Sequence, residues 1–316
     1  MKKAWVGVTD GSWYRFLAER PELGEVNFWR PSSKDEFKAL NRGDPFFFKT
    51  KAPHNRIVGG GFFSGFERFP LSEAWDLFGE ANGAASLDEL RQRLNANRRS
   101  NPIAVGDDPV IGCILVRDVR FFPAGQEADP PQDFARNLVQ GRGYKLKEHP
   151  EAAYLTRLAT RLLGYDVEID DSKPWHLPGP VLGDPRLQPR RLGQGSFKTA
   201  VLEAYGRRCA ITGSRIRPTL QAAHILPVSE GGLHSLDNGL LLRADVHVLF
   251  DKGYLSVDQD YRLKVSPRLQ ADFEDGEELY ARAGQPIALP QRAADRPNRD
   301  FLEWHETRIF KASRRG

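Results

Sequence analysis

The chain has 316 residues, enough for two domains of ordinary size, and its net charge of +4 weakly favours a polyanionic partner. Hydrophobic residues make up 40% of the chain, but no apolar run reaches the roughly 18 residues of a membrane span. We therefore expect a globular, cytoplasmic protein with no membrane partner. The two cysteines, Cys113 and Cys209, exclude a disulfide framework and, unless two chains share one, a zinc site of four cysteines.

The first half of the chain predicts a sheet with helices around it. We predict strands at 4–8, 26–29, 46–48, 56–63 and 111–116, because these runs are apolar or aromatic and several are bounded by turn residues. We predict helices at 13–17, 72–78 and 86–94, the last opened by a capping box of Ser86 and Glu89. The fold class is therefore α+β, with a small mixed sheet over residues 1–165 that closes into a barrel.

A change of composition separates this domain from the rest. Five prolines and several glycines lie between residues 166 and 195, which predicts a semi-rigid linker. A short helix at 197–205 then opens a second domain, 196–316, whose tail ends in an amphipathic helix at 299–311.

Basic residues are concentrated at the junction of linker and second domain. Between residues 186 and 217 there are eight lysines and arginines and one acidic residue, Glu203. Such a segment either holds DNA phosphates or is a solvated linker. The candidates for phosphate binding are Arg190, Arg191, Arg207, Arg208 and Arg215.

A spaced set of polar residues in the second domain predicts phosphodiester chemistry. His224 is followed after fourteen residues by Asn238 and after nine more by His247. His224, at the end of a short strand, suits a general base, and Asn238 can orient that base or brace its loop. His247 and Asp251 stand four residues apart, so they share one helix face and can bind one metal ion. Asp245 points elsewhere, and we expect it to cap the helix or support the ligands.

The segments around these residues resemble the HNH endonuclease family, over roughly residues 197–268. The resemblance rests on Cys209-Ala-Ile-Thr-Gly213, Ala222-Ala-His-Ile225, Asn238-Gly-Leu-Leu-Leu242 and Asp245-Val-His-Val-Leu-Phe-Asp251. It implies a ββα-metal finger in which His224 is the base, Asn238 the middle residue, and His247 and Asp251 the ligands. The implied ion is Mg²⁺ or Mn²⁺, with Co²⁺ or Ni²⁺ as alternatives.

The chain departs from that family at two places. Ala223 stands where many members have a metal-binding acid or histidine before the base, so the fourth ligand is left open. Cys209 has no cysteine partner at Thr212 or Gly213, so we expect no structural zinc. The finger would be held by packing instead, through Leu240, Leu242, Leu249, Phe250 and Leu255. For His234 and His305 we expect a structural role.

The N-terminal half resembles the PUA-like superfamily, which includes the EVE, ASCH, YTH and SRA modules. The resemblance rests on the turn at 41–45, the strand at 46–49 and the glycine-interrupted strand at 57–63. It implies a reader of nucleic acid that holds a flipped modified base between aromatic rings. The pocket candidates are Asp10, Trp13, Trp29, Phe62, Phe63 and Asn55, and we expect about half of the aromatic candidates to be core residues.

The two resemblances together imply a modification-dependent restriction endonuclease. We expect it to bind double-stranded DNA carrying a modified cytosine, such as 5-methyl- or 5-hydroxymethylcytosine, and to hydrolyse it. A double-strand break would need two copies of the site, which favours a homodimer. Two alternatives stay open: a nuclease whose N-terminal domain senses phosphorothioate, a plain sequence motif or RNA, and a non-enzymatic nucleic-acid-binding regulator.

Overall fold

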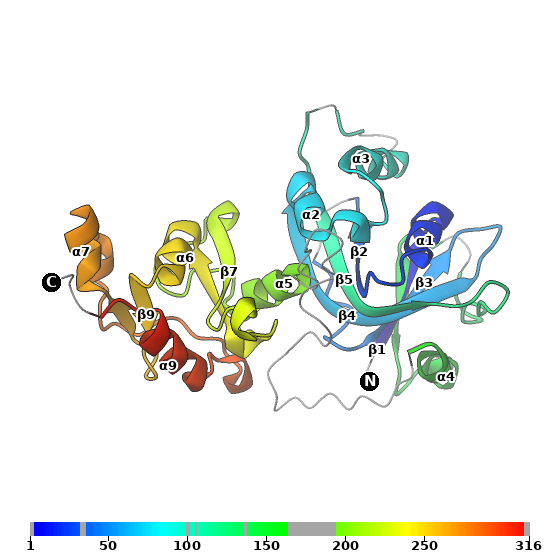
Figure 1. Cartoon of the computed structure of the whole chain (residues 1–316). Coiled ribbons are helices and arrows are strands. Elements are labelled where there is room, and N and C mark those ends of the chain that lie inside the picture. Colours follow the sequence, from blue (N-terminus) through cyan, green and yellow to red (C-terminus); the bar gives the residue numbers. More distant parts are fainter. Residues whose placement is uncertain are drawn as a thin grey trace. The chain divides into compact units, whose positions relative to one another are not determined.

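The computed structural model describes residues 3–31, 36–98, 102–104, 106–135, 138–163 and 194–312 (Figure 1). The chain divides into two compact units, Met1–Ile169 and Asp170–Gly316, which we describe separately. The linker predicted at 166–195 lies outside the described residues apart from its last two. No helix in the described parts of the chain combines the length and the apolar character needed to cross a membrane.

One six-stranded mixed sheet organises the N-terminal unit. Its strands are β1 (Lys3–Thr9), β2 (Glu25–Arg30), β3 (Pro45–Thr50), β4 (Ile57–Pro70), β5 (Val110–Phe121) and β6 (Gly141–Lys145). The order is β2-β5-β4-β3-β1-β6; β1 and β3 are parallel, and every other neighbouring pair is antiparallel. Among the described residues, β2 and β6 are the sheet edges, and a hydrogen bond of 3.0 Å from Arg30 to the Gln140 side chain joins their ends.

Three consecutive glycines, Gly59 to Gly61, lie near the start of β4. A Cβ atom on Gly60 would lie 2.7 Å from the carbonyl oxygen of Phe46 on β3. On Gly61 it would lie 2.5 Å from the carbonyl oxygen of Arg117 on β5. Glycine at both positions therefore allows β4 to run close to both neighbouring strands.

Both faces of this sheet are covered. Alternation along β3 places Phe47 in one core cluster and Phe46 and Phe48 in another, and all three side chains are fully buried. Helix α4 (Ala152–Leu163) packs on the Phe47 face through residues such as Leu155. Helix α1 (Gly11–Ala18) packs on the other face, and Figure 1 shows the sheet between the two helices. The remaining helices of this unit are α2 (Leu71–Phe78), α3 (Leu87–Ala96) and the 3₁₀ turn η1 (Gly79–Asn82).

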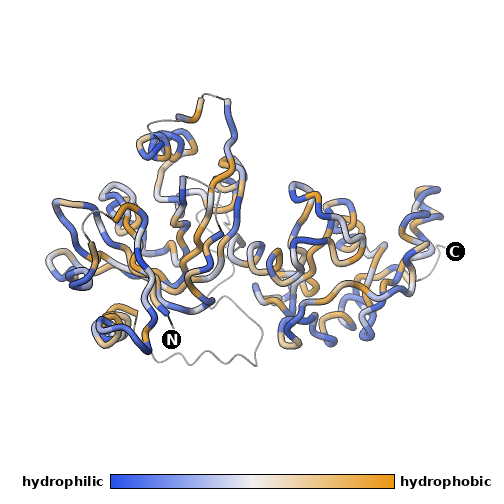
Figure 2. The backbone as a smooth tube through the Cα atoms, turned by 180° about the vertical axis from the view of Figure 1, so that it is seen from behind, coloured by the Kyte–Doolittle hydropathy of each residue, from blue (hydrophilic) through white to orange (hydrophobic). Residues whose placement is uncertain are grey.

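The C-terminal unit contains a hairpin followed by a helix. Strands β7 (Leu220–His224) and β8 (Gly239–Arg243) pair antiparallel, and α6 (Ala244–Asp251) follows at once, which is the ββα order that the sequence predicts. The other elements are α5 (Gln194–Ala204), β9 (Leu255–Val257), β10 (Leu263–Val265), α7 (Pro267–Phe273), α8 (Glu277–Tyr280), α9 (Arg299–Arg308) and short 3₁₀ turns. Figure 2 shows hydrophobic residues along the strands and hydrophilic residues at many of the turns.

The finger is held by packing. Leu240, Leu242, Phe250 and Leu255 are at most 1% exposed, whereas Leu249 is only half-buried. The ring of His305 on α9 stacks on Phe250 with centroids 3.8 Å apart, and hydrogen bonds engage both of its nitrogens. His305 therefore has the structural role that the sequence suggested.

Candidate active site and base pocket

The loop between β7 and β8 is fixed by the side chain of Asn238. This amide is fully buried; its oxygen accepts from the Leu226 N–H at 2.8 Å, and its nitrogen donates to the carbonyl oxygens of Leu226 and Leu233, both at 3.0 Å. Gly232 packs closely against the same loop, since a Cβ there would be 1.9 Å from the carbonyl oxygen of Leu226. Of the two roles considered for Asn238, the hydrogen bonds are those of a loop brace.

His224 ends β7 and is held by two contacts. Its ring stacks on Phe197 of α5 with centroids 4.2 Å apart and an interplanar angle of 17°. Its Nε2 lies 2.9 Å from Nδ1 of His234, which is itself only 1% exposed. We expected a purely structural His234; the structure places it directly against the predicted base. The only cue in the sequence was a second histidine within the segment from His224 to Asn238.

His247 and Asp251 lie on one face of α6, as their spacing predicts. His247 Nε2 is 3.4 Å from Asp251 Oδ2, and His247 Nδ1 is 2.7 Å from the side-chain oxygen of Gln221 on β7. Because that oxygen can only accept, Nδ1 carries the proton and Nε2 presents its lone pair toward the carboxylate. Burial lowers the pKa of His247 while the Asp251 carboxylate opposes this, so the imidazole stays neutral in neutral solution.

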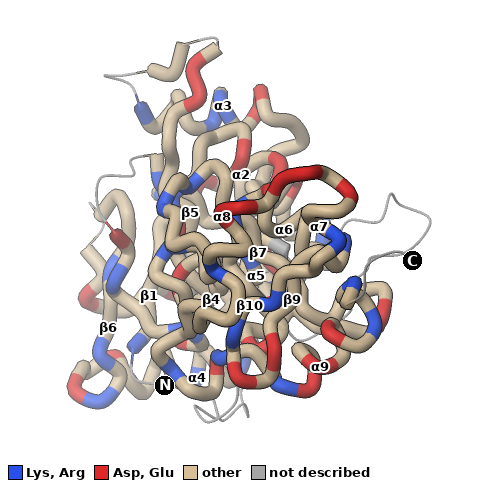
Figure 3. The backbone as a smooth tube through the Cα atoms, turned by 90° about the vertical axis from the view of Figure 1, so that its left-hand side faces the viewer, with Lys and Arg blue, Asp and Glu red and all other residues tan. Residues whose placement is uncertain are grey.

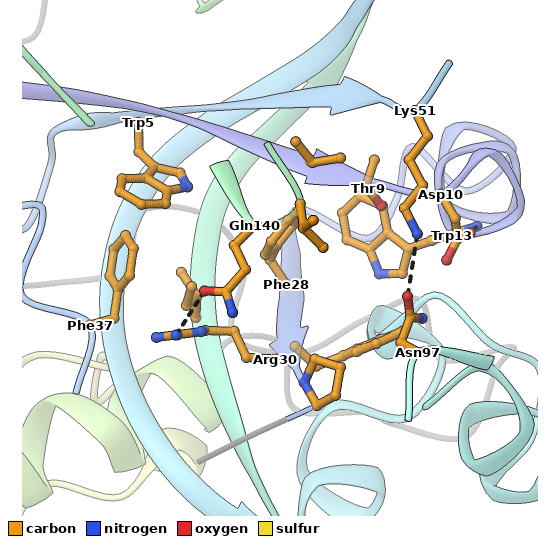
Figure 4. A pocket seen from close by; sticks show the side chains of 15 residues that line it. Trp5, Thr9, Asp10, Trp13, Phe28, Arg30, Phe37, Lys51, Asn97 and Gln140 are labelled. Carbon is orange, nitrogen blue, oxygen red and sulfur yellow. Dashed lines mark hydrogen bonds between the residues drawn. The ribbon is translucent and has the colours of Figure 1, made fainter. Parts of the chain in front are cut away.

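The N-terminal unit holds a cavity of about 300 Å³ beside α1 (Figure 4). Its aromatic lining comes from Trp5, Trp13, Phe28, Trp29 and Phe37. Its polar lining comes from Thr9, Asp10, Arg30, Lys51, Asn97 and Gln140. Two hydrogen-bonded pairs span it, Arg30 with Gln140 at 3.0 Å and Lys51 with Asn97 at 3.3 Å. Trp5 Nε1 is a buried donor with no hydrogen-bond partner among the described residues, and Figure 4 shows it facing the other lining groups.

Half of the predicted pocket residues line this cavity. Asp10, Trp13 and Trp29 do, and Asp10 also caps α1 by accepting from the Trp13 N–H at 2.7 Å. Phe62, Phe63 and Asn55 do not line this cavity. Phe62 is buried in the core cluster on the Phe47 face and Phe63 in the opposite one, and Asn55 lies in the β3–β4 turn with a φ of 50°.

One family model matches part of the C-terminal unit. Residues 209–258 match the family model of the HNH endonucleases. These residues form an HNH endonuclease domain. A comparison with curated proteins found no match.

Two solved structures are similar to the chain. A substituted form of the ASCH protein from Zymomonas mobilis matches with a TM-score of 0.33 and 12% identity, over 50% of this chain and 96% of its own. The modification-dependent restriction endonuclease TagI matches with a TM-score of 0.31 and 13% identity, over 93% of this chain and 78% of its own.

The HNH family uses a divalent metal ion, and the His247–Asp251 pair fits one. A metal-binding histidine commonly donates its second N–H to a carbonyl or carboxylate, which is what His247 does with Gln221. The described residues contain no cluster of three or more His, Cys, Asp or Glu side chains placed around an ion, and Ala223 is fully buried. Two protein ligands would leave coordination positions for water and for substrate phosphate.

Asp245 is committed to a different partner. Arg243 donates to its two oxygens at 2.7 and 2.8 Å, and this hydrogen bonding lowers the pKa of Asp245. Arg243 also reaches Glu278 on α8 (Glu277–Tyr280) at 3.4 Å, and Figure 3 shows acidic residues along the chain near α8. Asp245 lies in the first turn of α6 rather than at its N-cap, which is Arg243. Its hydrogen bonds to Arg243 join the end of β8 to the first turn of α6.

Three of the five predicted phosphate-binding arginines lie among the described residues of the C-terminal unit. Arg208 and Arg215 are exposed, and Arg207 is half-buried with a φ of 57°. Arg190 and Arg191 lie outside the described residues. Nearby, the buried sulfur of Cys209 accepts from the Thr212 and Arg243 N–H groups at 3.4 and 3.3 Å, so it ties the 209–213 turn to the end of β8.

Proposed function

We propose that this protein is a metal-dependent DNA endonuclease that recognises a modified base in the cavity of its N-terminal unit and cuts with its HNH domain. The observation that carries the nuclease part is the oriented pair of His247 and Asp251, with His224 held at the end of the adjoining hairpin strand.

In the proposed reaction His224 takes a proton from a water molecule, which attacks phosphorus while the bond to the leaving oxygen breaks. Because Nε2 is hydrogen-bonded to His234, the proton-accepting atom is Nδ1. The divalent ion on His247 and Asp251 would stabilise charge on the phosphate and leaving oxygen. Gln221 holds His247 in the tautomer that binds it, and Asn238 keeps the loop after the base in place.

The cavity supports recognition of a base rather than of the DNA backbone. A flipped base needs flat apolar walls and a few polar groups for its edge. Trp5 and Trp29 supply half-exposed rings, and Trp5 Nε1 is a donor still lacking an acceptor in the described structure. Two cations, Arg30 and Lys51, against the single carboxylate of Asp10 suit the adjoining phosphates. A modified cytosine fits these requirements, whereas a phosphorothioate sulfur needs no enclosed aromatic cavity.

Cleavage of three otherwise identical DNAs tests the proposal. They carry cytosine, 5-methylcytosine or 5-hydroxymethylcytosine, and each is incubated with Mg²⁺ or Mn²⁺ and with EDTA. We expect metal-dependent cutting confined to modified DNA. Equal cutting of all three would refute the reader and keep the nuclease. No cutting of any, with a phosphorothioate DNA cut instead, would replace the modified base by a modified backbone.

Two variants assign the parts. His224→Ala should abolish cutting and leave binding to modified DNA unchanged. Trp5→Phe keeps a six-membered aromatic ring in the cavity and removes the N–H donor together with the five-membered ring of the indole, so it should weaken binding to modified DNA while cutting at saturating DNA continues. If Trp5→Phe binds all three DNAs as the wild type does, the cavity is not the reading site.

A further inference from the structure

The strongest feature that the proposed function leaves unused is the histidine pair in the β7–β8 loop. His234 is 1% exposed, although histidine is usually at least partly exposed, and its Nδ1 lies 2.9 Å from His224 Nε2. Phe197 lies against both rings, with centroids 4.2 Å from His224 and 5.2 Å from His234, and both contacts are stacked. The two imidazoles are thus held together edge to edge on one aromatic surface.

A neutral imidazole carries one N–H, so only one member of the pair can donate in this hydrogen bond. If His224 donates from Nε2, its Nδ1 has a lone pair and can take a proton. If His234 donates from Nδ1 instead, His224 must carry its own proton on Nδ1 and cannot act as a base there. The bond therefore decides whether His224 is in the reactive tautomer.

Proton transfer favours the first arrangement. When His224 takes the proton of water on Nδ1, its Nε2–H still points at the lone pair of His234 Nδ1. The same hydrogen bond then joins a cation to a neutral acceptor, which makes it stronger. Neither imidazole ring has to move during the step, and the proton of the hydrogen bond between the two histidines stays on His224 Nε2.

The loop that carries His234 is built to hold it still. Asn238 bonds to the Leu226 amide and to the carbonyl oxygens of Leu226 and Leu233, so it clamps the loop immediately before His234. Gly232 allows the chain to pass close to Leu226, where any side chain would collide with the backbone. His234 is therefore presented to His224 from a fixed backbone.

We propose that His234 is a positioning residue that fixes the tautomer and ring orientation of the general base His224. This inference rests on the proposed nuclease function of His224. The sequence alone predicted only a structural role for His234, because a lone buried histidine is usually structural.

Three substitutions in the full-length protein separate an acceptor from mere packing. His234→Asn places its side-chain oxygen where Nδ1 was. His234→Gln places its polar atoms one bond further out, near the former Nε2, and His234→Leu fills much of the space with no acceptor. Thermal unfolding of all three reports any loss of packing.

We expect single-turnover cleavage of the preferred DNA to fall at least about 100-fold for His234→Leu and His234→Gln, with little change in KM. His234→Asn should stay within about 10-fold of the wild type, although all three lose the stacked ring. Wild-type rates for folded His234→Leu, or equal loss in the Asn and Leu variants at equal melting temperature, would overturn the inference.

A second measurement does not depend on cleavage. Nitrogen-15 chemical shifts of the His224 ring report which nitrogen carries the proton. We expect Nε2–H in the wild type and in His234→Asn, and a mixture of tautomers in His234→Leu. An unchanged tautomer in His234→Leu would refute the positioning role even if the protein cut no DNA. If the tautomer changes in His234→Leu but the wild-type protein cuts no DNA, the positioning role stands and the proposed function is refuted.

Discussion

Replacing Asn238 by alanine should unfold the catalytic loop, because this one side chain makes three hydrogen bonds in a dry environment. Each intramolecular hydrogen bond contributes about 0.5–1.5 kcal/mol, and buried groups left without partners raise the loss, so Asn238→Ala should cost roughly 3 kcal/mol. The cost falls on the C-terminal unit and on the segment that carries His234. Cleavage should fall with it, because the general base loses its partner.

The assay is urea unfolding of the full chain, combined with hydrogen exchange of the peptides that cover residues 225–238. Asn238→Asp is the matched control, since it keeps the shape and the acceptor for the Leu226 N–H. It replaces the donor that serves two carbonyl oxygens by an acceptor that repels them. We expect Asp to be at least as damaging as Ala. Native protection in the Asp variant, or a loss below about 1 kcal/mol in the Ala variant, would refute the brace.

Three further predictions concern the same unit. Burial lowers the pKa of His305 to about 4 from 6.5, so protonation favours the unfolded state; stability present above pH 6.5 should be lost as the pH falls toward 4. Urea unfolding of the wild type should show a loss of about 3 kcal/mol in the free energy of unfolding between pH 6.5 and pH 4, and His305→Asn should reduce this pH dependence. If the free energy of unfolding depends equally on pH in both proteins, His305 is not the group responsible. Gln221→Ala should weaken Mn²⁺ binding about 10–100-fold by calorimetry, whereas Gln221→Glu keeps the acceptor and the affinity; unchanged binding in the Ala variant would exclude Gln221 as the partner that orients His247. Gly232→Ala should destabilise the unit more than Gly231→Ala, because a Cβ at 232 meets the Leu226 oxygen at 1.9 Å whereas one at 231 meets nothing within 4 Å and suffers only its φ of 89°. Calorimetric unfolding compares the two glycine variants, and equal melting temperatures would mean that the loop yields at Gly232.

The local sequence pattern was enough to predict elements made mainly of buried apolar residues. The phenylalanines of β3 and the glycine-rich β4 follow from runs of apolar residues and turn residues, whereas the ββα order was expected from the resemblance to the HNH family. Strand β6 was missed because Gly141-Arg142-Gly143-Tyr144-Lys145 has few residues typical of a strand. It forms a strand by pairing with β1, and that partner lies more than a hundred residues away.

The cavity of the N-terminal unit could not be predicted from local sequence pattern. Arg30 and Gln140 are 110 residues apart and Lys51 and Asn97 are 46 apart, yet each pair is hydrogen-bonded at the cavity. No spacing rule connects such residues, because the sheet order brings them together. Phe62 looked as suitable as Trp29, but it is buried in the core cluster on the Phe47 face, whereas the aromatic residues that line the cavity belong to the opposite cluster or pack against it.

Buried polar contacts tie the parts of the HNH domain together. Where related domains have pairs of zinc-binding cysteines, the Cys209 sulfur accepts two backbone N–H groups, and on the far side of α6 the His305 ring stacks on Phe250. Asn238 fixes the loop that follows the proposed base, His224. None of these contacts uses His247 or Asp251, the two proposed metal ligands, which both lie on α6. The fold can therefore tolerate an ion that is bound loosely and completed by water and phosphate. Orientation of the ligands and the base then depends on two neighbours, Gln221 for His247 and, by our proposal, His234 for His224.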